Sequence, residues 1–365
     1  MAATSLALHD VRVLETATHL MGPFAGRLLG SLGATVLKAE SSSGDTLRNV
    51  ADGTLFAYLN AGKQSIATDD PGDIERLARG AHIWIDARPL DQIRASHEAL
   101  REEERPLVHV AVTPFGLRGP WAGREATGIV AAAMGGFMHL CGDPTREPLK
   151  NGGYLPEFQA GLFAAIGSVA GLLALESGRP GPLEVDVSLL EAVIAFQERA
   201  DMALVHQGRD WIRSRRHEVG HPFTIFECAD GFVSLAVGMP RHWANLAVLI
   251  GKPEWAEDPE IVMNRLAHAD MIDEALEPWL KEHPVADVVR MCQELFIPCG
   301  PVLSADEVLE DAHHAERKFF TTMALPGNGE IRVPGSPLRA PWASSDLPPS
   351  PALGEHNARW LGAAV

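Results

Sequence analysis

Cysteine is scarce in this chain of 365 residues, and positive charge is in deficit. The four cysteines are far apart and form no C-x-x-C pair, which favours reduced thiols in a cytoplasmic protein. Acidic residues outnumber Lys and Arg by 48 to 31, a formal net charge of -17. This balance argues against partnership with nucleic acid or an anionic membrane surface, so a polyanionic ligand would need a local basic pocket.

Targeting and membrane signals are also weak. The first ten residues, "MAATSLALHD", contain neither a basic n-region nor a long apolar h-region, so we expect no signal peptide. The stretch 158–175 is apolar enough to suggest a membrane span, but it contains Gly161, Gly167 and Gly171 together with polar Gln159 and Ser168. Such a segment is better explained as a buried helix packed closely on its small face.

The common cofactor motifs are missing as well. Gly22, Gly26 and Gly30 recur every four residues without forming G-x-G-x-x-G, and "LNAGKQS" lacks the upstream glycine of a Walker loop. His313 and His314 are adjacent on an expected helix with no obvious third ligand. We therefore expect neither a redox nucleotide cofactor nor a metal. The glycine repeat predicts instead a helical face that another backbone can approach closely.

What is present is an alternation of strands and helices. A βαβ unit is predicted from a strand, a turn closed by Pro23, a helix and a second strand, and more alternating elements follow. The predicted strands are 11–15, 35–40, 65–69, 83–87 and 107–113, and the predicted helices are 24–33, 71–81 and one from Pro156 to 175. The stretch 183–204 is predicted as a short strand that leads into a second apolar helix. This pattern is typical of an α/β domain with a parallel sheet.

The texture changes after residue 221. A hairpin with an Asp230-Gly231 turn, a helix and two amphipathic helices predict a smaller α+β domain. We divide the chain into a large domain (1–200), a linker (201–221), a small domain (222–298) and a proline-rich tail (299–365). The tail has too few periodic apolar positions for a domain of its own, so we expect it to return to the large domain.

One carboxylate stands at the start of the longest helix. If Pro156 takes the first helical position, Glu157 falls in the first turn, where free N–H groups and the helix dipole stabilise an anion. Acidic residues are common in first turns, so position alone does not make Glu157 functional.

Ordered motifs along nearly the whole chain resemble the class III CoA-transferases, the family of formyl-CoA and carnitine CoA-transferases that includes α-methylacyl-CoA racemase. They are "VRVLE…GPFAGRLLGSLGATVLKAE", "LNAGKQSIATD", "PEFQAGLFAAIGSVAGLLAL", "IPCGPVLSADEVLED" and "LGEHNARWL". The resemblance implies a Rossmann-like large domain built from both chain ends, a small domain between them, and two interlocked chains in a homodimer.

The resemblance also implies an activity. Family members carry acyl and CoA groups on an aspartate at the helix start, where this chain has Glu157. A glutamate keeps the chemistry of a carboxylate nucleophile but reaches one methylene further. The implied reaction moves CoA from an acyl-CoA to a carboxylic acid acceptor, with coenzyme A esters as substrates and no metal or redox cofactor.

Ligand-binding positions are carried over from the same motifs. Lys63 matches the CoA-contacting lysine, and His19, Leu20 and Met21 occupy the loop whose backbone meets the adenosine portion of CoA. Arg88 is a displaced match to an arginine of the family, and the basic run 213–216 is a further candidate for phosphate contact.

Three alternatives stay open. A racemase or epimerase needs two bases on opposite sides of one carbon, and the histidine of family racemases is replaced here by the stretch Glu125-Ala126-Thr127. A non-catalytic CoA-ester-binding protein would keep the fold without turnover. An acyl-CoA hydrolase would let water intercept the glutamyl intermediate.

Overall fold

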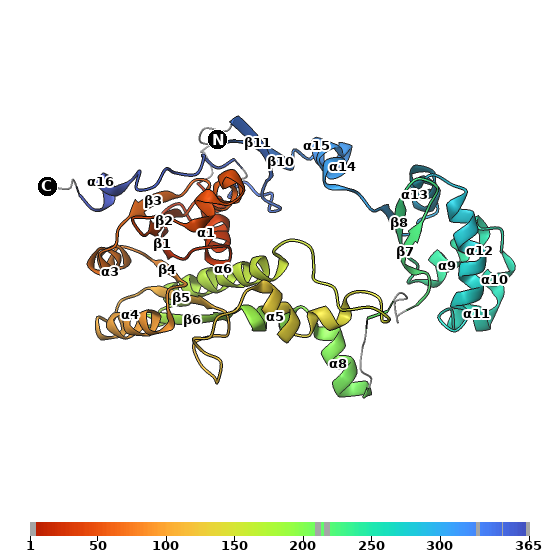
Figure 1. Ribbon diagram of the computed structural model, residues 1–365, viewed down its shortest axis with the longest axis horizontal. Coiled ribbons are helices and arrows are strands. Elements are labelled where there is room, and N and C mark those ends of the chain that lie inside the picture. Colours follow the sequence, from red (N-terminus) through yellow and green to blue (C-terminus); the bar gives the residue numbers. More distant parts are fainter. Residues whose placement is uncertain (1–4, 209–212, 215–219, 326–328, 345, 363–365) are drawn as a thin grey trace. The chain divides into compact units, whose positions relative to one another are not determined.

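A computed structural model describes residues 5–208, 213–214, 220–325, 329–344 and 346–362 (Figure 1). The chain divides into two compact units. Unit 1 comprises residues 1–139, 149–211 and 312–365, and unit 2 comprises residues 140–148 and 212–311. Unit 2 contains the segment predicted as a small domain together with residues on both sides of it.

Unit 1 is built on a six-stranded sheet with the order β3-β2-β1-β4-β5-β6, and every neighbouring pair is parallel. The strands are β1 (Arg12–Thr16), β2 (Thr35–Glu40), β3 (Gln64–Ala67), β4 (Ile83–Asp86), β5 (Val108–Thr113) and β6 (Leu183–Ser188). This is the strand order of the Rossmann fold, so the α/β fold class predicted from the sequence is confirmed.

Helices cover both faces of this sheet. On one face, α1 (Met21–Ser31), α6 (Leu155–Glu176) and α7 (Leu189–Ala195) bury a core with the alternate strand residues Val13, Ile85 and Val110. On the other, α3 (Pro71–Arg79) and α4 (Leu90–Glu102) pack over Leu14, Leu37 and Trp84. The near-continuous burial of the strands follows from this double cover.

Two helix boundaries differ from the prediction. Helix α1 begins at Met21, so the turn expected over 18–23 ends at residue 20 and the helix starts three residues earlier than predicted, because a proline is tolerated in the first helical turn. The apolar segment 189–204 is broken into α7 and α8 (Glu198–Gln207), with Gln197 between them. The side-chain amide of Gln197 donates to the backbone oxygen of Gly135, the residue that follows α5 (Gly128–Met134). This hydrogen bond connects the break between α7 and α8 to the end of α5.

Helix α6 is the one described helix long and apolar enough to cross a membrane. It begins at Leu155, one residue before Pro156. Its small residues pack inward: a Cβ at Gly161 would lie 2.6 Å from the carbonyl oxygen of Met21, and Cβ atoms at Gly167 and Gly171 would crowd Val185 and Val108. These small residues place α6 directly against α1 and the sheet.

Unit 2 contains an antiparallel sheet of β7 (Phe223–Glu227), β8 (Phe232–Ala236) and β9 (Cys299–Pro301). The hairpin predicted around Asp230-Gly231 is confirmed by β7 and β8. Its helices are α9 (Pro240–Leu249), α10 (Glu254–Glu257), α11 (Pro259–Met263), α12 (Ala269–Lys281), α13 (Val285–Glu294) and α14 (Ala305–Glu310).

The C-terminal segment packs on unit 1, where it lies beside the red N-terminal part in Figure 1. The side chain of Asn357 bonds both backbone groups of Ala67, each at 2.9 Å, and Trp360 donates to Gln64 at 2.6 Å. The remaining elements of unit 1 are short: α2 (Thr54–Asn60), α15 (Ala312–Glu316), β10 (Phe320–Leu325), β11 (Gly329–Pro334), α16 (Asn357–Trp360) and the 3-10 turns Thr46–Asn49 and Ala51–Gly53. A third 3-10 turn, Phe137–Leu140, lies where the chain passes from unit 1 to unit 2.

Candidate active site

The sheet has a topological switch point between β1 and β4, because the strand order runs outward in opposite directions from that pair. In such sheets ligands bind outside the carboxyl ends of the strands at the switch point. The loop after β1 contains His19 and Leu20 and leads into Met21, and the loop after β4 contains Arg88. Four residues predicted to bind CoA therefore follow the two strands at the switch point, where a ligand is expected.

The backbone of this loop is unusual at His19, which has a φ of 63° without being glycine. Its side chain is exposed, whereas Leu20 is buried and Met21 half-buried. Leu20 packs in a small cluster with Leu47 and Phe56, so the loop is anchored by one apolar side chain.

Glu157 lies close to the same loop. One turn further along α6, Gly161 packs on the carbonyl oxygen of Met21, and the rings of Phe24 and Phe158 meet edge to face at 4.6 Å. These contacts join the starts of α1 and α6. The structure therefore brings the predicted nucleophile and the predicted CoA loop into one region.

The carboxylate of Glu157 has one hydrogen-bond partner among the described residues. The backbone N–H of Gly128, the first residue of α5, donates to Oε1 at 2.9 Å. The half-buried side chain borders a cavity of about 150 Å³. The cavity is lined by Thr127, Gly128, Ile129, Ala132, Lys150, Asn151, Gly153, Tyr154, Pro156 and Glu157. A small polar group in this cavity can therefore approach the side chain of Glu157.

The ammonium group of Lys63 makes all of its hydrogen bonds within the protein. Its Nζ is buried and donates to Oε2 of Glu15 at 2.7 Å, to Oδ1 of Asn60 at 2.9 Å and to the carbonyl oxygen of Pro23 at 2.9 Å. Burial, opposed by the nearby carboxylate of Glu15, lowers the pKa of Lys63 to about 8. A phosphate would have to displace one of these three acceptors.

A second lysine completes the arrangement. Nζ of Lys38 lies 3.2 Å from Oε1 of Glu15 and 2.9 Å from Oδ2 of Asp45, and it donates to the carbonyl oxygen of Ala17 at 2.9 Å. The two ammonium groups thus hold Ala17, just before the loop 18–20, and Pro23, in the first turn of α1. This buried network fixes both ends of the predicted CoA loop.

Gly26 makes room for the network, because a Cβ there would overlap the carboxylate of Glu15 and lie 3.1 Å from Nζ of Lys63. The expectation that the glycines of α1 admit another backbone was wrong at this position. The three glycines instead leave room for side chains of the sheet and of the residue after β1. Gly26 faces Glu15, Gly22 faces Ala17 and Gly30 faces Val36.

Arg88 is held against the sheet. It donates to both carboxylate oxygens of Asp86 (2.9 and 2.7 Å) and to Ser96 at 2.8 Å, and its guanidinium lies 4.7 Å from the ring centroid of Trp84. Burial alone would raise the pKa of Asp86, but hydrogen bonds from His109 and Arg88 outweigh it and lower the pKa to about 2. Within the described residues Nη1 of Arg88 makes no hydrogen bond, so this nitrogen remains for a ligand.

Of the basic run 213–216, residues 215 and 216 lie outside the described residues. Arg213 belongs to unit 2, where it donates to the backbone oxygens of Asp143 (3.0 Å) and Arg146 (2.9 Å).

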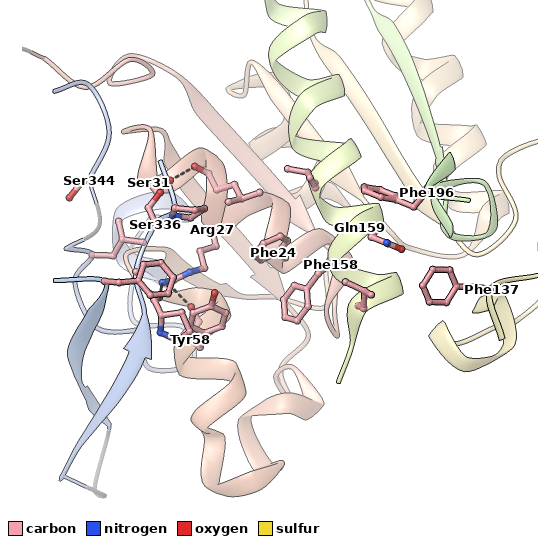
Figure 2. Close-up of a pocket in the computed structure, with 18 residues that line it drawn as sticks. Phe24, Arg27, Ser31, Tyr58, Phe137, Phe158, Gln159, Phe196, Ser336 and Ser344 are labelled. Atoms are coloured by element: carbon pink, nitrogen blue, oxygen red, sulfur yellow. Dashed lines mark hydrogen bonds between the residues drawn. The ribbon is translucent and has the colours of Figure 1, made fainter. Parts of the chain in front are cut away.

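A larger cavity, about 680 Å³ and mostly apolar, opens on another face of α6 (Figure 2). Leu155, Phe158, Gln159 and Leu162 contribute to it at helical spacing, whereas Glu157 does not line it. Figure 2 shows Arg27 over Tyr58, with the guanidinium 4.1 Å from the ring centroid. This cavity is therefore separate from the carboxylate site.

Sequence reasoning missed two residues of the carboxylate site, Gly128 and Lys150. Gly128 precedes Glu157 by 29 residues, and Lys150 is an exposed side chain with no hydrogen-bond or ion-pair partner in the described part of the chain. No rule of sequence spacing connects Gly128 or Lys150 with Glu157. Residues 140–148, which belong to unit 2, separate Gly128 from the other two.

Comparison with known proteins identifies the family. The model of CoA-transferase family III matches residues 8–357. A formyl-CoA:oxalate CoA-transferase of Streptomyces avermitilis is 30% identical over 386 residues, covering 96% of this chain and 94% of that protein. A succinate–glutarate CoA-transferase of Agrobacterium fabrum is 29% identical, covering 97% and 94%. The crystal structure of a CAIB/BAIF family protein from Brucella suis superposes with a TM-score of 0.83 at 26% identity, over 98% of both chains.

The chain belongs to CoA-transferase family III. The resemblance seen in its motifs is confirmed, and the protein is a transferase that acts on CoA thioesters.

Proposed function

We propose that the protein transfers CoA between two carboxylic acids and that Glu157 carries the covalent intermediates. The observation that supports this most directly is the position of Glu157, at the start of α6 beside the switch-point loop, where it lines a cavity of about 150 Å³. Crevices at switch points bind nucleotides such as the adenosine part of CoA, and a carboxylate is one of the side chains that can act as a nucleophile and form a covalent intermediate.

The reaction proceeds in four balanced steps. An oxygen of Glu157 attacks the thioester carbonyl of the donor, the C–S bond breaks and CoA leaves as a thiolate, so that a mixed anhydride of the donor acid and Glu157 remains. The thiolate attacks the glutamyl carbonyl and expels the donor acid, leaving a glutamyl-CoA thioester. The acceptor carboxylate then attacks this thioester and expels CoA thiolate. Finally the thiolate attacks the acceptor carbonyl of the second anhydride, which forms the new acyl-CoA and regenerates the carboxylate.

The other predicted site residues take different parts in this proposal. The backbone at His19, Leu20 and Met21 receives the adenosine portion of CoA, and Arg88 offers Nη1 to a phosphate. Lys63 supports the loop from below, since its three hydrogen bonds all go to acceptors within the protein. Hydrogen bonds from a charged ammonium group are stronger than neutral ones, so Lys63 fixes the backbone carbonyl of Pro23 firmly in place.

We also propose that the protein works as a cytoplasmic homodimer, without nucleic acid or a membrane as partner. Helix α6 exposes Leu162, Ile166 and Leu173 at 41%, 54% and 58%, next to the apolar cavity of about 680 Å³. Exposed large apolar side chains along one helix suggest an interaction surface. A second copy of the chain, interlocked with the first as the family resemblance implies, would cover this face of α6.

Oxygen-18 tests the route of transfer. If the acceptor acid is labelled in its carboxylate, the first turnover leaves labelled oxygen on Glu157, and the next turnover delivers it to the released donor acid. Mass analysis of the donor acid should find this label. Label that comes instead from water would indicate a hydrolase, and a donor acid free of label after many turnovers would exclude the glutamyl anhydride.

A further inference from the structure

The space around the carboxylate of Glu157 is limited on one side by Gly128. A Cβ built on Gly128 would overlap Cδ and both oxygens of Glu157. The same residue donates its backbone N–H to Oε1 at 2.9 Å. One residue thus supplies both the room for the carboxylate and the hydrogen bond that holds it.

We propose that Gly128 is the positioning residue for Glu157, matched to the length of the glutamate side chain. This inference rests on the proposed role of Glu157 as nucleophile. The missing Cβ admits the longer side chain, and the N–H holds Oε1 of the carboxylate at the cavity that Lys150 and Tyr154 also line.

The physical reason is the freedom of the glutamate. Glutamate has one more rotatable bond than aspartate, and a freely rotating carboxylate would spend little time in the attacking geometry. A displacement of about 1 Å at a reacting atom can reduce the rate by roughly 10²-fold. The backbone N–H of Gly128 donates to the carboxylate where the two residues come closest. This hydrogen bond restricts the rotation of the glutamate side chain without the need for another side chain.

The backbone of Gly128 does not itself require glycine. Its φ is not in the left-handed region, and it begins a helix in which alanine is the more favourable residue. Gly128→Ala therefore keeps the N–H and the helical conformation, and its effect comes from the added methyl group. The three atoms nearest to the added methyl group all belong to the carboxylate of Glu157.

A double-mutant cycle tests the proposal: wild type, Gly128→Ala, Glu157→Asp and the double variant. In the wild-type background Gly128→Ala should lower kcat by about 10²-fold, because the methyl group displaces the carboxylate, and should leave KM for the acyl-CoA nearly unchanged. In the Glu157→Asp background the shorter side chain leaves space, so the same change should alter kcat by less than about threefold. The covalent adduct trapped with hydroxylamine should follow kcat in all four proteins.

Gly300→Ala is the matched control, because a Cβ at Gly300 in unit 2 meets no atom within 4 Å. It should leave kcat and the melting temperature unchanged. If Gly128→Ala lowers kcat equally in both backgrounds, the methyl group acts through the backbone and the proposal fails while the glutamyl mechanism stands. If the wild type itself forms no adduct with any acyl-CoA that it binds, the proposed function fails, and the positioning role fails with it.

Discussion

Nζ of Lys63 lies 2.7 Å from Oε2 of Glu15, and the two side chains are 1% and 0% exposed. Between them these groups reach both sides of the loop after β1, because Lys63 donates to Pro23 and Glu15 also pairs with Lys38, which donates to Ala17. The loop that we assign to CoA is therefore supported by a buried ion pair rather than by its own contacts alone.

Removing this support should destabilise the fold. Lys63→Met leaves Glu15 with one counter-ion fewer in a site closed to water, and breaking a buried pair in this way typically costs about 3–5 kcal/mol. Urea unfolding should show a loss of this size. Lys281→Met is the control, since Lys281 is 51% exposed and its contact with Glu227 is 3.6 Å long, and it should cost less than about 1 kcal/mol.

The same variant separates loop support from direct phosphate contact. If Lys63 only supports the loop, affinity for a CoA ester should fall in Lys63→Met but decline with added salt as steeply as in the wild type. Calorimetry at several ionic strengths measures both quantities. A distinctly shallower salt dependence in the variant would mean that a charge–phosphate contact was lost, which would return Lys63 to the role predicted from the sequence.

Asp86 should make stability depend on acid pH. Its pKa of about 2 in the folded protein lies below the usual 3.8, so the unfolded chain binds the proton more readily between these values. The stabilisation is complete above pH 4 and is lost as the pH falls through 2, and it amounts to about 2 kcal/mol. Asp86→Asn should therefore lower the free energy of unfolding at pH 7, and the difference from wild type should narrow below pH 4.

The exposed Asp10 provides the comparison for this titration, since its side chain is 88% exposed. Asp10→Asn should change the free energy of unfolding little at either pH. A difference between Asp86→Asn and wild type that is as large at pH 3 as at pH 7 would show that the carboxylate contributes through packing and not through its charge.

Much of the fold follows from local sequence, whereas the site does not. Strands such as 83–86 are short β-branched runs bounded by turns, and they form where they are predicted. Helix α4 was not predicted, because its apolar residues are few and its first turn follows Pro89. Local propensity does not reveal contacts that only the folded sheet creates.

The polar contacts of the site illustrate the same limit. Lys63 is 48 residues from Glu15, and Gly128 is 29 residues from Glu157. The motif around Lys63 predicts a binding residue, but only the three-dimensional arrangement shows that its ammonium group faces inward. The place of Glu157 in a first helical turn could be predicted locally, from a proline ahead of a long apolar helix, whereas its role as nucleophile is implied by the family resemblance.

The contact between α1 and α6 should be sensitive to a single methyl group. A Cβ at Gly161 would lie 2.6 Å from the carbonyl oxygen of Met21, so Gly161→Ala must push the helices apart and should cost about 1–3 kcal/mol in urea unfolding. Gly30→Ala is the control, because its Cβ would meet Val36 at an ordinary 3.7 Å and should be neutral or stabilising. Equal effects of the two substitutions would contradict close packing at Gly161.

The exposed face of α6 should be covered in solution. Sedimentation at micromolar concentration should give twice the mass of one chain, and Ile166→Glu should yield monomer or poorly folded protein, because a charge in an apolar interface is unpaired. Met263→Glu, at a residue 79% exposed in unit 2, should leave the dimer intact. A wild-type protein that sediments as a monomer would contradict the proposed assembly.

The most direct measurement is to locate the covalent intermediate. After incubation with a broad panel of acyl-CoA esters, hydroxylamine should convert the activated carboxylate to a hydroxamate that peptide mass analysis finds on Glu157. Glu157→Gln should give no hydroxamate although it still binds the esters, because an amide cannot form the anhydride. A hydroxamate on another residue, or none with any ester that binds measurably, would contradict the assignment of Glu157 as the nucleophile.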